Sequence, residues 1–131
     1  MKHTLIVLIF IFECSINVFS SESILTCTFS DFSTFNMNSK NEINVKALRD
    51  KNPTKIIFAN LNQTTPLVKE ESREVLLKVV HRSDDSIFMI EMLAPTSMYT
   101  IYPKLKVVVW SKQYLDPGGR PFSFMSMGTC K

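Results

Sequence analysis

The chain has 131 residues, 45% of them hydrophobic and 21% charged, with a formal net charge of +3. This length suits one domain with a modest core and leaves no room for a second domain of ordinary size. The basic residues are dispersed, whereas nucleic-acid binders cluster them on one face, so no nucleic-acid partner is expected.

The first residues have the order of a secretory signal peptide. A short basic start is followed by an apolar run, Thr4–Phe12, and then by Glu13 and a Val-Phe-Ser stretch that ends at Ser20. This order predicts cleavage near Ser20, so that residues 1–20 are the signal peptide and residues 21–131 are a single secreted or periplasmic β domain. A retained anchor needs about 20 apolar residues, and Glu13 would lie inside it. No membrane span is therefore expected after cleavage.

Cleavage also bears on the cysteine count. The chain contains Cys14, Cys27 and Cys130. A lipoprotein modified at Cys14 is disfavoured because Glu13 is a poor residue directly before a lipidated cysteine. Removal of the signal peptide leaves two cysteines, which can pair in an oxidising compartment. We expect a Cys27–Cys130 disulfide that ties the two ends of the domain together. A free-thiol or metal role is disfavoured because no third ligand lies near either cysteine in the sequence.

Short β-rich segments alternate with turn residues along the rest of the chain. The expected strands are 24–30, 55–61, 73–81, 86–93, 98–102, 105–114 and 122–130. The connections are too short for crossover helices, so parallel α/β architecture is disfavoured. The fold class predicted is all-β and mainly antiparallel, a small up-and-down β-barrel or a β-sandwich of about seven or eight strands.

Residues 38–53 fit two interpretations. Ser39–Glu42 has the spacing of a helix capping box, and Ile43, Ala47 and Leu48 could share one helix face before Asn52-Pro53 ends it. The stretch Ile43–Leu48 also alternates loosely, as a strand would. A short helix or irregular excursion is slightly favoured.

The last hairpin gives the sharpest hypothesis. Gly118-Gly119 suits a two-residue loop, which would place Trp110 opposite Met127 and Lys112 opposite Met125. Val107, Val109, Phe122 and Phe124 would then face the core. The other face would carry a candidate binding patch on the surface, formed by Trp110, Lys112, Tyr114, Met125 and Met127. A one-residue slip exchanges the two faces, and cover by another strand would make the patch ordinary core.

Metal binding is the weaker interpretation of the same residues. Met125 and Met127 put two thioethers on one side of a strand, and thioethers suit Cu(I). With Trp110 and His81 they could form a site similar to that of small periplasmic copper chaperones. Two methionines at this spacing are unsurprising in a chain with seven, so no metal or cofactor is expected.

No catalytic constellation is apparent. His81 is the only histidine after residue 20, and a solvent-facing histidine at a strand end explains it. An enzyme would need a site assembled from Glu91, His81 or Tyr114, which the sequence does not show. We expect a non-enzymatic protein.

Three stretches, Leu25–Phe29, Ser86–Glu91 and Gly128–Lys131, resemble a loose family of short exported bacterial proteins of unknown function. In that family a cysteine-containing first strand and a Gly-x-Cys end bracket a small β domain. The resemblance implies export, β structure and the Cys27–Cys130 pairing, and it implies no activity.

A second likeness is to the small exported β-barrel inhibitors of lysozyme. Their inhibitory loop is rich in serine and glycine and ends in tyrosine, whereas Ser111–Tyr114 of this chain lacks the glycines.

The sequence thus favours an exported binding or interaction protein of the cell envelope or extracellular space. Its partner would be a protein or a small apolar ligand. The alternatives are a barrel that carries a small apolar ligand, an inhibitor of an extracytoplasmic enzyme such as lysozyme and, with less support, a periplasmic Cu(I)-binding protein.

Overall fold

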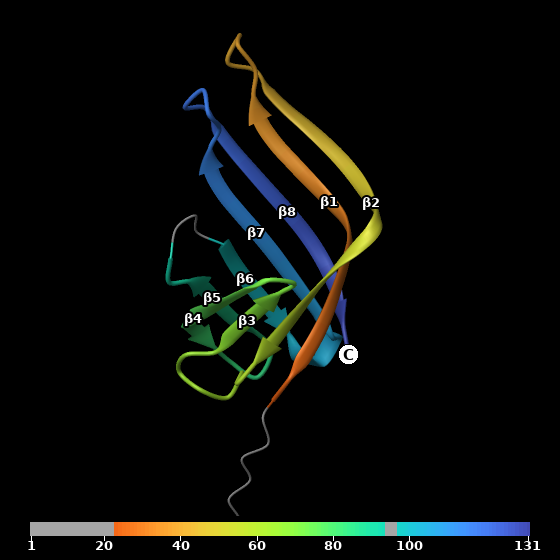
Figure 1. The fold of residues 1–131 in the computed structure, drawn as a ribbon, viewed down its shortest axis with the longest axis vertical. Helices are drawn as coiled ribbons and strands as arrows, with labels where there is room; N and C mark the ends of the chain where they lie inside the picture. Colours follow the sequence, from red (N-terminus) through yellow and green to blue (C-terminus); the bar gives the residue numbers. More distant parts are fainter. Residues whose placement is uncertain (1–22, 94–96) are drawn as a thin grey trace, which may run out of the picture.

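A computed structural model describes residues 23–93 and 97–131 of the chain. These residues form eight antiparallel strands that close into one barrel (Figure 1). The strands are β1 (Leu25–Met37), β2 (Ile43–Ala59), β3 (Leu67–Glu70), β4 (Arg73–Arg82), β5 (Ile87–Glu91), β6 (Ser97–Tyr102), β7 (Val107–Leu115) and β8 (Pro121–Cys130), with a 3-10 turn at Pro103–Leu105. Each strand pairs with the next in sequence and β8 returns to β1, so the predicted up-and-down barrel is confirmed.

The barrel interior is filled by side chains from alternate positions of the strands. In β6 every second residue, beginning at Ser97, is buried, and β5 shows the same alternation. The largest fully buried side chains include Phe58, Leu77, Met89 and Ile101. Alternation of this kind places one face of each strand in the core and the other toward solvent.

The disulfide joins the first and last strands. Cys27 of β1 lies directly opposite Cys130 of β8 in the antiparallel ladder, and the two are bonded. Both are buried. The predicted pairing of Cys27 with Cys130 is therefore confirmed, and it closes the barrel where the two ends of the sheet meet.

The β1–β2 and β7–β8 hairpins extend beyond the closed part of the barrel. Strands β1, β2, β7 and β8 continue past strands β3 to β6, and Figure 1 shows them as one curved sheet that rises above the barrel. We call this extension the arm; it comprises residues 31–49 and 110–127. Its strand order is β2-β1-β8-β7. A register shift between Phe29 and Asp31, which skips residues 50–53 of β2, marks the start of the arm in β1 and β2.

The expectation of a helix or irregular excursion within residues 38–53 was wrong, because Ile43 to Ala59 is strand. Residues Ser39–Glu42, which have the spacing of a helix capping box, form a turn and not the start of a helix. The Asn38 side-chain oxygen accepts hydrogen bonds from the backbone N–H groups of Lys40 and Glu42, at 2.8 and 2.9 Å. Asn41 adopts a left-handed backbone conformation, with φ of 60°. These bonds build a tight turn, and the chain leaves it as a strand.

The expected register of the last hairpin was also wrong, by one residue. Trp110 lies opposite Ser126, and Met127 lies opposite Val109. The loop is one residue longer than predicted: Gly119 donates to the Asp116 carbonyl, Asp116 donates to the Arg120 carbonyl, and Gly119 takes a φ of 74°. This is the three-residue hairpin loop in which a left-handed residue follows the turn. The extra residue exchanges the two faces of β8 relative to β7.

The predicted signal peptide, residues 1–20, lies outside the described residues. Within the described part of the chain, no helix has the length and apolar character needed to cross a membrane.

Candidate functional site

The inner face of the arm continues the barrel interior. Val108 is fully buried in the core, and the register of β7 with β8 runs without a break. Alternate residues of β7 therefore stay on the inner side, so Trp110, Lys112 and Tyr114 follow Val108 onto the inner face of the arm. The packed core is therefore continuous with the inner face of the arm at the rim of the barrel.

A cavity of about 550 Å³ lies on this inner face. Its lining is dominated by aromatic rings, and only Lys112 is charged. The lining residues are Phe32, Thr34, Trp110, Lys112, Tyr114, Phe122 and Phe124. We call it the aromatic pocket.

Trp110 forms the junction between the core and the aromatic pocket. Its indole stacks on Tyr99 of β6, with ring centroids 6.1 Å apart, and meets Phe29 edge-on at 5.6 Å. On the pocket side it meets Phe124 at 4.8 Å, and Phe124 in turn lies 5.5 Å from Phe32. Contacts of this geometry fix ring positions and add to the stabilisation from burial. The pocket floor is thus anchored to the packed core.

The structure divides the predicted patch between two faces. Trp110, Lys112 and Tyr114 line the aromatic pocket, as a set. Met125 and Met127, which were expected beside Trp110, lie on the opposite, outer face and are 48% and 63% exposed. The expectation that Phe122 and Phe124 face away from Trp110 was wrong for the same reason, the one-residue difference in register.

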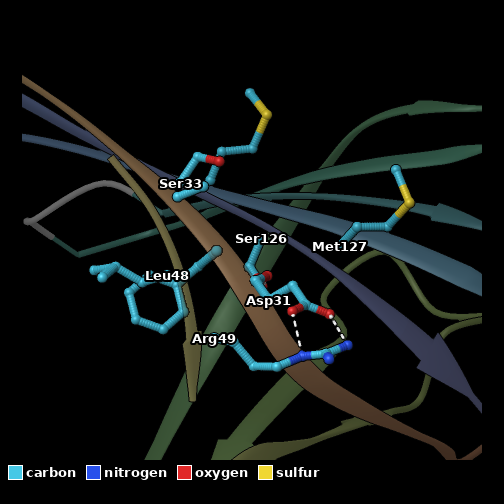
Figure 2. Close-up of a pocket in the computed structure, with 9 residues that line it drawn as sticks. Asp31, Ser33, Leu48, Arg49, Ser126 and Met127 are labelled. Atoms are coloured by element: carbon cyan, nitrogen blue, oxygen red, sulfur yellow. Dashed lines mark hydrogen bonds and ion pairs between the residues drawn. The ribbon is translucent and has the colours of Figure 1, made fainter. Parts of the chain in front are cut away.

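The outer face has its own hollow, also about 550 Å³. Figure 2 shows its lining, with the Asp31–Arg49 ion pair close to Ser126 and Met127 on neighbouring strands. Arg49 Nε lies 2.8 Å from Asp31 Oδ1, and this hydrogen bond holds the pKa of Asp31 below its ordinary value. Both side chains are largely exposed, and such pairs contribute little to stability.

The predicted copper set is not assembled. His81 is on β4, which pairs with β3 and β5, whereas Met125 and Met127 are on β8, between β7 and β1. Trp110 is on the other face of the sheet from the two methionines. No group of three or more His, Cys, Asp or Glu residues is arranged to hold a metal ion within residues 23–93 and 97–131.

A partly buried polar cluster surrounds Glu91, whose side chain is 1% exposed. Arg73 Nη2 is 2.7 Å from Glu91 Oε1 and 3.2 Å from Glu70 Oε1, and the Tyr99 hydroxyl donates to Glu91 at 2.8 Å. Burial, together with the nearby Glu91 carboxylate, raises the pKa of Tyr99. Glu91, one residue considered for catalysis, is thus held by Arg73 and Tyr99. His81, another such residue, is exposed on β4 and Tyr114 lines the aromatic pocket, so the three are not brought together.

Sequence reasoning missed four of the pocket residues: Phe32, Thr34, Phe122 and Phe124. The alternation Phe32-x-Thr34 and Phe122-x-Phe124 is visible in the sequence, but it specifies a shared face only once the register is known. The stretch compared with the loop of the lysozyme inhibitors, Ser111–Tyr114, lies within strand β7.

Comparison with known proteins gave no assignment. A scan against protein-family models, a search of curated proteins and a search of solved structures each found no match to this chain. The motif resemblances described above stay predictions.

Proposed function

We propose that this chain is a non-enzymatic, extracytoplasmic binding protein that holds a small apolar ligand in the aromatic pocket. The observation that carries the proposal is a cavity of about 550 Å³, lined chiefly by aromatic rings, at the rim of a filled barrel. Small-molecule sites typically have volumes of about 300–1,000 Å³ with mostly apolar walls, and barrel mouths are one of their preferred places.

The filled interior determines where the ligand would lie. Phe58, Leu77 and Met89 fill the space that a ligand-carrying barrel keeps open. The ligand would therefore lie on Trp110 and Phe124, between the barrel rim and the inner face of the arm, and not inside the barrel. The absence of catalysis is proposed because Lys112 is the only ionisable group besides Tyr114 that lines the pocket.

An extracytoplasmic location is supported by two independent features. The buried Cys27–Cys130 disulfide needs an oxidising compartment to form and persist. The order of basic, apolar and small residues in the first twenty positions is that of a secretory signal.

The test is a titration with N-phenyl-1-naphthylamine, an uncharged aromatic probe whose fluorescence rises in apolar surroundings. We expect saturable binding to the wild-type protein. Phe124→Ala removes a ring that contacts both Trp110 and Phe32, and loss of its buried area should weaken binding about tenfold or more.

The matched control is Met127→Ala, which truncates an exposed side chain on the outer face of the same strand. It should leave the dissociation constant of the probe unchanged. The proposal is wrong if the wild-type protein does not bind the probe, or if Met127→Ala weakens binding as much as Phe124→Ala.

A further inference from the structure

The ladder of the arm places two lysines on the inner face at opposite ends of one row. Thr34 of β1 lies opposite Lys46 of β2 on one side and opposite Phe124 of β8 on the other, and Phe124 lies opposite Lys112 of β7. Directly opposed residues share a face of the sheet. The row Lys46–Thr34–Phe124–Lys112 therefore crosses the arm from edge to edge, with a lysine at each end.

This row and the rows on either side of it contain no acidic side chain. The neighbouring rows are Leu48–Phe32–Ser126–Trp110 and Asn44–Asn36–Phe122–Tyr114. Among the described residues, neither Lys46 nor Lys112 takes part in an ion pair. Lys112 lines the aromatic pocket and Lys46 is exposed on β2, so both ammonium groups are free to pair with an acidic ligand.

A further donor lies in the lining of the aromatic pocket. The indole nitrogen of Trp110 is buried and has no hydrogen-bond acceptor within the described part of the chain. An indole N–H donates only, as does an ammonium group. The two ammonium groups therefore favour a ligand that carries negative charge.

We infer that the ligand is an acidic amphiphile: an apolar body that lies on the Trp110 and Phe124 rings and a carboxylate or similar acid that binds between Lys46 and Lys112. This inference rests on the proposed function and specifies the chemical class of its ligand. The outer strands of the row are three strand spacings apart, about 14 Å in a flat sheet, and the long flexible stem of lysine lets both ammonium groups reach inward. A carboxylate fits this span, and the alkyl or ring portion of the ligand would lie on the aromatic rings below it.

The experiment compares two ligands that differ only in the head group. Decanoate and decanol are each used to displace N-phenyl-1-naphthylamine from the wild-type protein at pH 8, where the acid is ionised. We expect decanoate to bind at least about fivefold more tightly, the effect of a partly solvated ion pair. The advantage should shrink as salt is added, because salt screens such pairs.

Variants assign that advantage to the row. In Lys112→Gln, and more fully in Lys46→Gln with Lys112→Gln, the ratio of the two dissociation constants should fall toward one. The control is Lys78→Gln, on the exposed outer side of β4, which should keep the wild-type ratio.

The outcomes separate the inference from the proposed function. If the uncharged probe and decanol bind but decanoate has no advantage in the wild-type protein, the inferred acidic head group is wrong and apolar binding stands. If the advantage persists in the double variant, the lysine row is not its source and the inference fails. If no probe binds, the proposed function itself fails. The wild-type comparison decides the first question even if a variant does not fold.

Discussion

Removal of Arg73 from the polar cluster around Glu91 should lower the stability of the protein substantially. Arg73 contacts both oxygens of Glu91, with Nη2 at 2.7 Å from Oε1 and Nη1 at 3.4 Å from Oε2. The Glu91 side chain is only 1% exposed, so Arg73→Met would leave a carboxylate inside the barrel with the Tyr99 hydroxyl as its one close donor.

The magnitude follows from this geometry. Breaking a buried ion pair by removal of one partner costs about 3–5 kcal/mol. The Arg73 side chain is 38% exposed, so water already reaches the guanidinium, and we expect the lower end, about 3 kcal/mol. The double variant Arg73→Met with Glu91→Gln removes the buried charge at position 91, and its glutamine can still accept the Tyr99 hydrogen bond. Glu70 also loses Arg73 in both variants, but its side chain is 24% exposed and water reaches it. It should be more stable than Arg73→Met alone by about 1–2 kcal/mol.

The assay is urea unfolding followed by the fluorescence of Trp110, the only tryptophan of the chain. Its indole contacts Tyr99, so its emission reports on the core next to the cluster. The wild type is compared with Arg73→Met, Glu91→Gln and the double variant. Equal m-values in all four proteins would show that stability alone has changed. The reasoning is refuted if Arg73→Met loses less than about 1 kcal/mol, or if the losses of the two single variants simply add in the double variant.

Three other predictions concern the strand ends and the core. A Cβ at position 128 would lie 2.9 Å from the Phe29 ring, so Gly128→Ala should lower the thermal midpoint at a cost of about 1–3 kcal/mol, and Phe29→Leu in the same chain should recover part of it; an unchanged midpoint would show that the ring has room to move. The disulfide joins two cysteines that are 103 positions apart in the sequence. Replacement of both Cys27 and Cys130 by alanine should lower the free energy of unfolding in urea by about 4.7 kcal/mol, and a decrease of less than about 1 kcal/mol would show that the disulfide does not stabilise the fold in this way. Because the pKa of Tyr99 is raised in the folded state, the unfolded chain binds fewer protons than the folded chain above about pH 10, and stability should fall as the pH rises there. The contribution of this group grows to at most about 1.4 kcal/mol per pH unit. Tyr99→Phe should remove that part of the slope between pH 10 and 11, and an identical slope in both proteins would exclude it.

The architecture was predictable from the sequence because its evidence is local and repeated. Each short β-rich segment with its turn residues indicates a strand, and their spacing excludes crossover helices. The two cysteines that remain after residue 20 predicted the bond between the ends. The strand Leu67–Glu70 and the first half of β2 were missed, because the former is short and polar at its end and the latter is mostly exposed, with little alternation of burial.

Only the β7 residues of the candidate site could be predicted from the sequence. Both a two-residue and a three-residue loop agree with the sequence Asp116-Pro117-Gly118-Gly119, and the two loops differ in register by one residue. That single residue decides whether Met127 or Phe124 shares a face with Trp110. Residues on β7 were grouped correctly because their alternation is internal to one strand. The partners from β1 and β8 depend on long-range pairing, which no local pattern specifies.

The pairing of β1 with β8 has a consequence for the order in which the protein can assemble. The chain is synthesised from its N-terminus, so Cys27 and the unpaired edge of β1 exist for as long as it takes to make the following hundred or so residues. The hairpins from β2 to β7 join neighbours in sequence and can form as the chain emerges, since nearby contacts close quickly. Closure of the barrel and formation of the disulfide must wait for the last strand. Any factor that protects exposed strand edges or delays thiol oxidation would therefore act on this protein in that interval, before β8 arrives.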